Sequence, residues 1–528
     1  MGEIKVYIPT DFSSIALGAD EVCDLIEMEA VKRNIPIKIV RNGSRGLYWL
    51  EPLVEVETSS GRVAYGPIKP SDIASLFEVE FWKGVREHPL YLGDVEETPY
   101  LKKQNRLTFE RVGIIDPLSI EDYTARGGFE ALKKALNMEP VMIIEEVKKS
   151  GLRGRGGAGF PTGIKWETVY KTPSDKKYIV CNADEGDSGT FSDRMVMEGD
   201  PYLLIEGMII AGLAVGADEG YIYLRSEYPI SKKILEKAIE KAYQRGYLGD
   251  NILGTGKRFH LEVYIGAGSY VCGEETALLE SLEGKRGLVR PRPPLPAVKG
   301  LWGKPTVINN VITLATVPWI IREGGEAYAE YGYGRSRGTL PIQLSGNVKF
   351  PGLVEVPFGV SLREIVYEFG GGTRSGKEVK AVQVGGPLGA YIPESKLDIP
   401  IDYESFNKAG AVLGHGGVVV FDEDADMAYL ARYSMEFCAK ESCGKCTPCR
   451  IGSVRATEVL DRLRRDGNSG KGIELMVDLM ETMMFASLCA LGGMAPIPVL
   501  SIFKHFSDEL GINFNEFMKL YEERFENN

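Results

Sequence analysis

The sequence predicts a multidomain protein of the α/β class whose last quarter is a helical bundle. A chain of 528 residues is too long for one hydrophobic core and predicts about three to four domains. Strand and helix patterns alternate along most of the chain, as in sheets covered by helices. After residue 426 the pattern is almost wholly helical, with a cysteine-rich motif between two helices. These observations divide the chain into the ranges 1–80, 81–125, 126–335, 336–422 and 423–528.

The first range predicts a small α/β unit. Short β-branched runs indicate strands, and apolar residues at helical spacing lie between the first two of them. A Ser-Ser-Gly turn between two alternating runs indicates a hairpin. In order, we expect a strand at 5–9, a helix at 16–33, a strand at 36–43, a hairpin at 53–67 and a short helix at 70–76. A polar connector follows over 81–125.

The remaining ranges predict three further units. Over 126–335, the strands KKYIVCN, GYIYLR and HLEVYIG alternate with helical segments, which indicates a sheet with helices on its faces. Over 336–422, short strands surround one helix, a pattern similar to a small β-grasp (SLBB-like) module. The range 423–528 predicts the helical bundle.

Composition and charge exclude several classes of protein. The contents of 44% hydrophobic and 26% charged residues are ordinary for a globular protein. A net charge of −12 argues against nucleic acid or an anionic membrane surface as the main partner, because either would need a basic face. The most apolar run, 203–217, is too short to span a bilayer and contains Glu206, so we expect a buried helix. The N-terminus has no signal-peptide pattern, and we expect a cytoplasmic protein without direct membrane insertion.

Four cysteines predict a metal centre in the bundle. Cys443, Cys446 and Cys449 are separated by two residues each, and Cys489 follows later in the chain. A C-x2-C-x2-C motif with one distant cysteine commonly binds a [4Fe–4S] cluster. Structural zinc is the alternative, although its usual layout is two C-x2-C pairs across a gap.

The other cysteines and the histidines do not extend this prediction. Cys438 lies on the preceding helix, which would direct its thiol elsewhere, and the three remaining cysteines are expected to be packed thiols: Cys23, Cys181 and Cys272. The four histidines are scattered, so we expect surface or packing residues and no histidine-based metal site: His88, His260, His415 and His505.

A glycine-rich loop spans 151–166. It contains Gly154, Gly156 and Gly159 in a G-x-G-x-x-G pattern, which marks a dinucleotide site when a strand precedes it and a helix follows. Here a helical segment precedes it, so an ordinary Rossmann fingerprint does not fit. The bare backbone can approach a flat ligand or a phosphate, with Phe160 available for stacking and Lys165 for charge. A plain flexible loop is the alternative.

Acidic side chains follow two predicted strands. Asp184, Glu185 and Asp187 come directly after KKYIVCN, where a solvated turn is the alternative interpretation. Glu274 and Glu275 open the helix that follows a second glycine-rich loop. Carboxylates at this position complement the helix dipole, and they also suit hydrogen bonding to ribose hydroxyls.

The segment PTVINNVIT, 305–313, adds two amides. Asn309 and Asn310 carry donors and acceptors suited to the nitrogens and carbonyls of a heterocyclic ring.

Taken together, six ordered motifs resemble one family. GRGGAGFPTGIKW, NADEGDSGTF, GAGSYVCGEETAL, GLWGKPTVINNV, ESCGKCTPCR and SLCALGG are similar to the NADH-binding flavoprotein subunit of respiratory complex I and its soluble relatives. The resemblance covers roughly residues 105–510. It implies a domain for FMN and NAD(H), a β-grasp module, and a helical bundle carrying one [4Fe–4S] cluster.

The resemblance also implies roles for individual residues. Those implied to line FMN are Gly154, Gly156, Gly157, Lys165, Asn182, Asp184, Asn309, Asn310 and Thr313. Those implied to face the nicotinamide cofactor are Phe160, Glu185, Asp187, Tyr270 and Glu275, and the cofactor-binding set also includes Ala158, Gly273 and Glu274. The implied cluster ligands are Cys443, Cys446, Cys449 and Cys489. The chain departs from the family pattern at Asp187, Leu295 and Ala490, where Glu, an aromatic residue and Pro are usual.

In the implied mechanism, electrons pass between NAD(H), FMN and the cluster, and the cofactors carry out the chemistry. Lys165, Glu185 and Asp187 are the candidate catalytic residues, because their charges act on the flavin. Together with Asp184, the two carboxylates would lower its potential, and Lys165 would oppose them. We expect no general acid, general base or covalent nucleophile.

The N-terminal unit narrows the resemblance. IVRNGSRGLYWLEPLVEVET and GRVAYGPIKPSDIASLF are similar to the thioredoxin-like extension on the diaphorase (beta) subunit of soluble NAD-dependent formate dehydrogenases. With Cys23 as its only cysteine, this unit cannot hold a [2Fe–2S] cluster. The implied partners are a small [2Fe–2S] thioredoxin-like (gamma-type) subunit and a large molybdenum- or tungsten-dependent catalytic subunit. The alternatives are a subunit of complex I or of an NAD-reducing hydrogenase, and a non-redox zinc-stabilised binding module.

Overall fold

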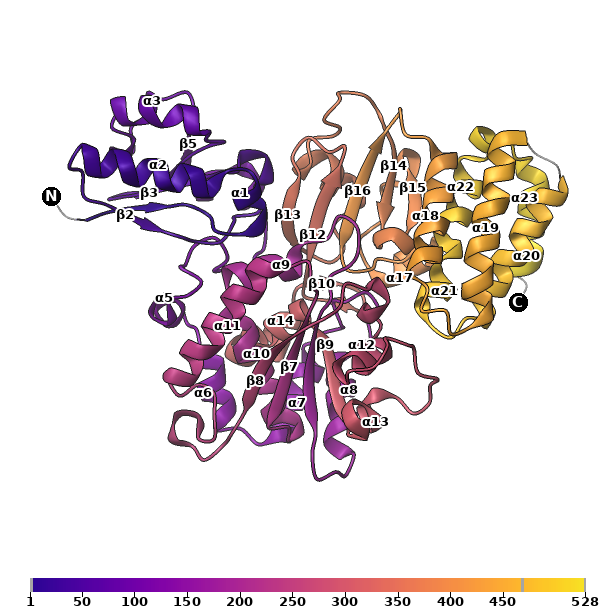
Figure 1. Cartoon of the computed structure of the whole chain (residues 1–528), viewed down its shortest axis with the longest axis horizontal. Coiled ribbons are helices and arrows are strands. Elements are labelled where there is room, and N and C mark those ends of the chain that lie inside the picture. Colours follow the sequence, from indigo (N-terminus) through magenta and orange to yellow (C-terminus); the bar gives the residue numbers. More distant parts are fainter. Residues whose placement is uncertain (1–2, 467–469, 527–528) are drawn as a thin grey trace.

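The computed structural model describes residues 3–466 and 470–526. Figure 1 shows an N-terminal sheet covered by helices, a central α/β domain, a second sheet, and a bundle of helices at the C-terminal end. The predicted mixed α/β class with a C-terminal bundle is therefore confirmed. Residues 1–2, 467–469 and 527–528 belong to the predicted first and last ranges and lie outside the described residues.

The N-terminal unit is built on a five-stranded sheet with the order β2-β1-β3-β4-β5. The first two strands are parallel and are joined by α2 (Ala19–Lys32), which buries Val22 and Ile26 against them. The strands are β1 (Ile4–Tyr7), β2 (Ile37–Val40), β3 (Val54–Thr58), β4 (Gly61–Tyr65) and β5 (Tyr91–Asp94). The helix α3 (Ile73–Glu78) follows the β3–β4 hairpin, near the position expected from the sequence.

One boundary prediction needs correction. The edge strand β5 pairs with β4, so the sheet continues into the range 81–125 that we expected to be only a connector. This strand has four residues and contains Gly93, and such a short segment carries little periodicity.

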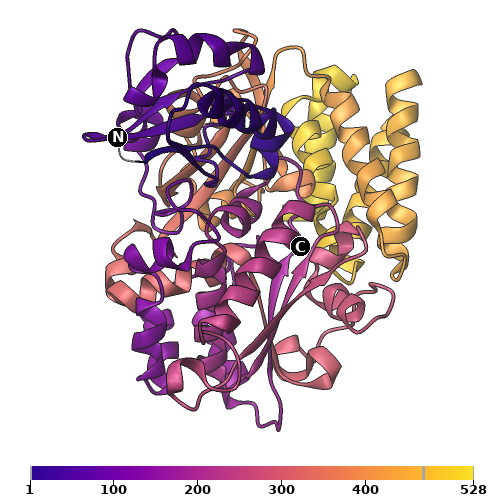
Figure 2. The ribbon, with the colours of Figure 1, turned by 60° about the vertical axis from the view of Figure 1, so that its left-hand side comes forward.

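The central domain is built on a parallel sheet with the order β8-β7-β6-β9. Its strands are β6 (Tyr178–Ala183), β7 (Glu219–Leu224), β8 (His260–Ile265) and β9 (Thr306–Asn310). Figure 2 shows helices on both faces of this sheet. From β6 the chain moves outward to β7 and β8, then returns on the other side of β6 as β9. The strand order reverses there, and ligands bind at the carboxyl ends of the strands at such a switch point.

Two helices form the centre of this domain's core. The predicted buried helix 203–217 is observed as α10 (Pro201–Val215), almost fully enclosed. It packs against α14 (Val311–Glu323), which starts directly after β9. Glu206 is buried within α10, where its carboxylate accepts hydrogen bonds from the Tyr123 hydroxyl and from the backbone N–H groups of Phe129 and Leu132. In the described part of the chain, no helix combines the length and the apolar character needed to cross a bilayer.

The N-terminal unit packs on the central domain through α9 (Ser192–Gly199). Arg194 donates to Ser13 Oγ at 2.6 Å, and the backbone N–H of Phe12 donates to Glu198 Oε2 at 2.8 Å. Ser13 and Phe12 belong to α1 (Phe12–Ala16). The first unit therefore contacts the helix that starts beside the carboxyl end of β6.

The second sheet has the order β13-β12-β16-β14-β15. Its strands are β12 (Thr339–Gly346), β13 (Gly352–Pro357), β14 (Val379–Val384), β15 (Ala390–Pro393) and β16 (Gly417–Asp422). The central strands β12 and β16 are parallel. The hairpin β12–β13 forms one side of the sheet, and the hairpin β14–β15 joins the other side through β14, which is antiparallel to β16. A helical turn, α16 (Leu362–Glu364), lies between the two hairpins in the sequence. This is the arrangement expected of a β-grasp module.

The C-terminal bundle shares a hydrophobic core with the central domain. Leu278 and Leu282 of α12 (Glu275–Leu282) pack in one cluster with Met435 and Met483 of the bundle. The bundle helices are α18 (Met427–Glu441), α19 (Thr447–Asp466), α20 (Gly470–Ala486), α21 (Ala490–Met494), α22 (Pro496–His505) and α23 (Phe514–Tyr521).

Candidate functional site

The predicted polar motifs meet at the switch point of the parallel sheet. Asn182, the next-to-last residue of β6, lies opposite Asn310 at the end of β9. Asn182 donates to the carbonyl oxygen of Gly273 at 2.8 Å, and Asn309 accepts from Trp166 Nε1 at 2.8 Å. The carboxyl ends of parallel strands share one edge, which explains how residues far apart in the sequence come together.

The glycine loop lies over this edge. It connects α7 (Pro140–Lys149) to α8 (Thr162–Lys171), so a helix precedes it, as expected. The Gly154 N–H donates to the Phe160 carbonyl at 2.8 Å, and the Arg155 N–H donates to Thr313 Oγ1 at 2.9 Å. A Cβ atom at Gly156 would lie 3.0 Å from the Cβ of Asn310. Thr313 therefore holds the loop, and glycine is needed for its close approach to β9.

The loop presents an open surface. Gly156 and Ala158 are exposed, and the Phe160 ring is 51% exposed. Gly157 has φ +110°, a conformation that residues with a side chain rarely adopt. Bare backbone and an uncovered aromatic ring thus lie side by side along one segment, which fits the approach of flat rings and a phosphate.

Two buried carboxylate oxygens at the switch point lack a hydrogen-bond partner among the described residues: Asp184 Oδ2 and Glu274 Oε1. Glu274 uses its other oxygen to cap α12 through the N–H groups of Thr276 and Ala277. Burial raises the pKa of Asp184 to about 7. Arg292 NH2 lies 3.9 Å from Glu274 Oε1, too far for a hydrogen bond. Buried acceptors without a donor are costly, so both oxygens fit a ligand that brings hydroxyl donors, as the ribityl chain of a flavin does.

The environment of Glu185 differs from the one expected. Its carboxylate is buried beneath α9 and accepts from the N–H groups of Asp193 and Arg194 and from the Tyr228 hydroxyl, at 3.0–3.1 Å. His415 Nε2 lies 3.1 Å from it as well. Burial acts to raise the pKa of Glu185, but the hydrogen bonds from His415 and the two N–H groups hold it below its ordinary value. All of these partners belong to the protein, so the structure places Glu185 in a closed, hydrogen-bonded environment, and its role at the nicotinamide cofactor stays a prediction.

His415 was missed by the sequence interpretation. It was expected to be a surface or packing residue, yet it is 5% exposed and contacts Glu185 and Asp193. No local motif marks this residue, because its partners lie more than 200 positions away in the sequence.

Asp187 lies where the central domain meets the second sheet. Its Oδ1 accepts from the Tyr270 hydroxyl at 2.7 Å, and burial raises its pKa. A Cβ atom at Gly386 would lie 2.4 Å from its Cγ, so only glycine fits opposite it. Tyr270 in turn packs edge-on against Phe437 of α18, with ring centroids 5.0 Å apart. The structure thus brings together Asp187 and Tyr270, two residues that the resemblance assigns to the nicotinamide cofactor.

Glu275 lies between two cations. Lys165 Nζ is 3.5 Å from one carboxylate oxygen, and Arg292 NH1 is 3.1 Å from the other. Lys165 also donates to the Ile308 carbonyl at 2.9 Å. Arg292 was not predicted from the sequence. Leu295, three residues further on, is 51% exposed.

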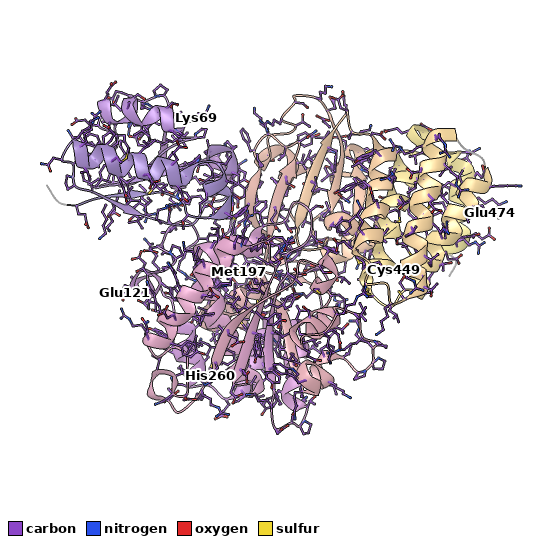
Figure 3. The ribbon with its side chains drawn as sticks, viewed as in Figure 1. Lys69, Glu121, Met197, His260, Cys449 and Glu474 are labelled. Carbon is purple, nitrogen blue, oxygen red and sulfur yellow. The ribbon has the colours of Figure 1, made fainter. Side chains whose placement is uncertain are left out.

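The four predicted ligand cysteines lie close to one another at the end of the bundle. Figure 3 shows Cys449 at the edge of the bundle that faces the central domain. A Cβ atom at Gly492 would be 2.8 Å from the Cβ of Cys449, so the segment after Cys489 lies directly on the C-x2-C-x2-C motif. Burial raises the pKa of Cys489 to about 11, while the N–H groups of Gly492 and Leu491 act in the opposite direction.

The spacing of the thiols argues against zinc. Four thiolates bound to one zinc ion at about 2.3 Å would lie within about 3.8 Å of one another. Across the described residues, the only three metal-binding atoms that lie within 4.8 Å of one another come from Glu185, Asp193 and His415. No three of the described cysteine sulfurs are therefore as close together as a tetrahedral zinc site requires.

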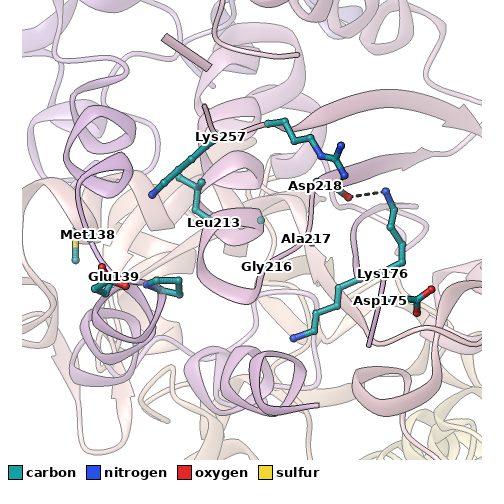
Figure 4. Close-up of a pocket in the computed structure, with 13 residues that line it drawn as sticks. Met138, Glu139, Asp175, Lys176, Leu213, Gly216, Ala217, Asp218 and Lys257 are labelled. Atoms are coloured by element: carbon teal, nitrogen blue, oxygen red, sulfur yellow. Dashed lines mark hydrogen bonds and ion pairs between the residues drawn. The ribbon is translucent and has the colours of Figure 1, made fainter. Parts of the chain in front are cut away.

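A cavity of about 450 Å³ opens at the opposite edge of the sheet (Figure 4). It is lined by residues that precede β6, β7 and β8, and it is therefore at the amino ends of the strands. Most of its charged groups have partners within the protein; Lys176 Nζ, for example, lies 2.6 Å from Asp218 Oδ1, and Lys257 donates to the Leu136 carbonyl at 2.8 Å. This cavity is not the candidate cofactor site.

Comparison with known proteins identifies similar families. The Nuo51 FMN-binding domain matches residues 147–319, and the NADH-ubiquinone oxidoreductase-F iron-sulfur binding region matches residues 429–512. The NADP-reducing hydrogenase subunit HndC of Solidesulfovibrio fructosivorans is 48% identical over 408 residues, 77% of this chain and 83% of that protein. An NADH-quinone oxidoreductase subunit of Rhizobium meliloti is 47% identical over 406 residues, 77% of this chain and 96% of that protein.

A solved structure is also similar. That of an NAD+-reducing [NiFe]-hydrogenase in the H2-reduced state matches with a TM-score of 0.69 and 29% identity, over 96% of this chain and 84% of that chain. The match therefore includes the N-terminal unit as well as the regions covered by the family models.

Proposed function

Because the chain belongs to the family of NADH-binding flavoprotein subunits of NADH-quinone oxidoreductase, the 51 kDa type, we propose that it is the diaphorase subunit of a cytoplasmic NAD-dependent formate dehydrogenase. It is an NADH-oxidising subunit with an FMN-binding domain and a [4Fe–4S]-binding region.

The N-terminal unit supports the formate dehydrogenase. Residues 39–58 and 61–77, which form much of its sheet, resemble the thioredoxin-like extension of formate dehydrogenase diaphorase subunits. A second candidate is the diaphorase subunit of an NAD+-reducing hydrogenase. It is favoured by the match to the hydrogenase structure, which also covers the N-terminal unit.

We assign FMN to the switch point. When bound, FMN accepts a hydride from NADH and passes electrons singly to the iron–sulfur cluster. Asp184 and Glu274 accept hydrogen bonds from the ribityl hydroxyls through their unpaired oxygens. The glycine loop admits the cofactor by close backbone approach, and the amides of Asn182 and Asn310 fix the edge against which it lies.

NADH binds over the same edge, on the side of the exposed Phe160 ring. Phe160 stacks on a ring of the cofactor, and Glu275 accepts from the ribose hydroxyls between its two cations. Asp187 and Tyr270, joined by a hydrogen bond, close the side nearest the bundle.

The four cysteines are the proposed [4Fe–4S] ligands. The core shared by α12 and the bundle excludes water between the two domains, and Lys445, inside the motif, donates to the Val289 carbonyl at 2.6 Å. These contacts fix the thiols relative to the flavin site, and a fixed, dry separation favours electron transfer by limiting reorganisation.

Exposed apolar side chains flank the thiols: Ile451, Val454, Phe485 and Leu488, each between 43% and 61% exposed. Apolar patches of this kind mark interaction sites. We propose that this surface contacts the electron-transfer partners, a small [2Fe–2S] thioredoxin-like subunit and a large molybdenum- or tungsten-dependent catalytic subunit.

Anaerobic purification tests the proposal. The isolated chain should contain FMN with about four irons per flavin and reduce ferricyanide with NADH, but should not oxidise formate. Addition of the small [2Fe–2S] subunit and the molybdenum or tungsten subunit should give formate-dependent NAD+ reduction. Formate oxidation by the lone chain, or six or more irons per flavin, would contradict this division of labour. Activity with [NiFe]-hydrogenase subunits in place of the formate-oxidising one would favour the second candidate.

A further inference from the structure

A buried histidine connects three segments around the proposed flavin site. His415 lies just before β16, and its ring reaches into the central domain. Its Nδ1 is 2.6 Å from the carbonyl oxygen of Arg155, in the glycine loop. Its Nε2 is 3.1 Å from Glu185 Oε1, after β6, and 3.3 Å from Asp193 Oδ1, at the start of α9.

These contacts define the protonation state of the ring. A carbonyl oxygen only accepts, so Nδ1 must carry a hydrogen. Nε2 faces two carboxylates and the Ser192 hydroxyl at 3.1 Å, and a carboxylate also only accepts. Both ring nitrogens therefore donate, and His415 is an imidazolium.

The surrounding charges favour this cation. Burial alone would lower the pKa of His415, but the carboxylates of Asp193 and Glu185 raise it well above its ordinary value. Asp193 Oδ1 has no other donor, while its Oδ2 accepts from Asn310 at 2.7 Å. The two carboxylates and the imidazolium carry a net charge of −1, which would become −2 with a neutral ring.

A bound metal ion is the competing explanation, since the three side chains place ligand atoms within 4.8 Å of one another. A metal ligand must present a bare ring nitrogen. The Nδ1–H group donates to the Arg155 carbonyl, and the Nε2–H group lies within reach of the two carboxylates. A doubly protonated ring explains the contacts of both ring nitrogens. A bound metal ion would explain only those of Nε2.

We propose that His415 is a positioning residue whose positive charge fixes the glycine loop against β6 and α9 and raises the reduction potential of bound FMN. The inference rests on the proposed flavin site. Asn310 links the cluster to that site, since it donates to Asp193 and also lies 3.0 Å from a Cβ built at Gly156. Loss of the imidazolium leaves one more uncompensated negative charge beside the cofactor, which disfavours the gain of electrons.

His415→Gln and His415→Asn test the charge. Gln retains a donor near the Nε2 position and Asn near the Nδ1 position, and both are neutral. Spectroelectrochemical titration at pH 7 should show FMN reduction weakened about tenfold in its equilibrium constant, about 30 mV for a two-electron couple. Asp193→Asn removes a negative charge and should shift the potential upward by a similar factor.

The double variant His415→Gln/Asp193→Asn restores the net charge of −1, and its FMN potential should return toward that of the wild type. His260→Gln is the matched control. His260 is a partly exposed histidine at the amino end of β8, with Nε2 3.1 Å from Asp250 Oδ1 and far from this edge, and its replacement should leave the potential unchanged (Figure 3).

Failure of the proposed His415 role can be distinguished from failure of the proposed flavin site. An unchanged FMN potential in the single variants, or a double variant that stays shifted like His415→Gln, would overturn the role of His415. A wild-type protein that binds no FMN at all would instead contradict the flavin site. If His415→Gln does not fold, His415→Asn, which is also neutral and keeps a donor at the Nδ1 position, gives the same test of the charge.

Discussion

Asp184 should make flavin binding depend on pH. Its Oδ2 is buried without a donor, and burial raises its pKa to about 7. A ribityl hydroxyl that donates to this oxygen stabilises the carboxylate and lowers the pKa in the complex. The flavin-free protein therefore holds more protons at this site than the complex, and the affinity for flavin must increase as the pH rises through 7.

The size of the effect follows from that pKa. A group with a pKa of about 7 is roughly 9% ionised at pH 6 and roughly 91% at pH 8. If only the carboxylate form binds, the Kd for flavin should fall about tenfold over this range. The FMN phosphate, with a second pKa of about 6, also titrates here, so riboflavin, which lacks the phosphate, isolates the contribution of the protein.

Fluorescence quenching on flavin-depleted protein measures this Kd at pH 6, 7 and 8. Asp184→Asn keeps an acceptor but cannot ionise, and its riboflavin affinity should be independent of pH. Asp175→Asn is the control, because Asp175 is an exposed residue paired with Lys304 at the opposite edge of the sheet, and this variant should keep the wild-type slope. A wild-type Kd for riboflavin that does not change with pH, or an unchanged slope in Asp184→Asn, would refute the reasoning.

Three further predictions concern the cluster, the nucleotide and stability. Cys489→Ser should lose most of the iron and keep the FMN; an unchanged iron content would show that Cys489 is not a ligand. Glu275→Gln should raise NADPH turnover relative to NADH, because it removes a carboxylate that repels a 2′-phosphate and frees Arg292; an unaltered ratio would place Glu275 away from the ribose. Burial raises the pKa of Glu198 to about 7, so its contribution to stability is complete below about pH 4.5 and is lost as the pH rises through 7. Between pH 6 and pH 8.5, the Glu198→Gln variant should lose roughly 1 kcal/mol less unfolding free energy than the wild type, because Gln does not ionise. Its Tm should therefore fall less over this range, and a fall equal to that of the wild type would contradict the prediction.

The sequence predicted those parts of the site that lie at the ends of regular elements. Asn182 and Asn310 lie at the carboxyl ends of strands with a clear apolar pattern, and parallel strands bring these ends to one edge. The four cysteines were predicted as ligands from their spacing alone, and they lie within the matched iron-sulfur binding region. These patterns are local in the sequence, so they can be interpreted without knowing how the domains pack.

The environment of Glu185 could not be predicted in the same way. The alternation of a strand indicates which side chains are buried, but it ends with β6 at Ala183. Whether a carboxylate two residues later is open or enclosed depends on α9 and on His415, which approach it from other parts of the chain. The sequence of an acidic run after a strand does not distinguish an open carboxylate from an enclosed one.

The second sheet completes the proposed flavin site, and the boundary we predicted near residue 335 divides that site. Gly157 of the glycine loop forms a β-bridge with Gly414, and Gly386 packs against Asp187. His415 adds the compensating charge. A fragment that ends at the boundary would keep the glycine loop and both carboxylates but lose the groups that hold them in place. Glu185 and Asp193 would then share a buried space without their common cation, which is strongly unfavourable, so α9 and the loop would have to open to water. The central domain therefore depends on its neighbour for the shape of its own cofactor site.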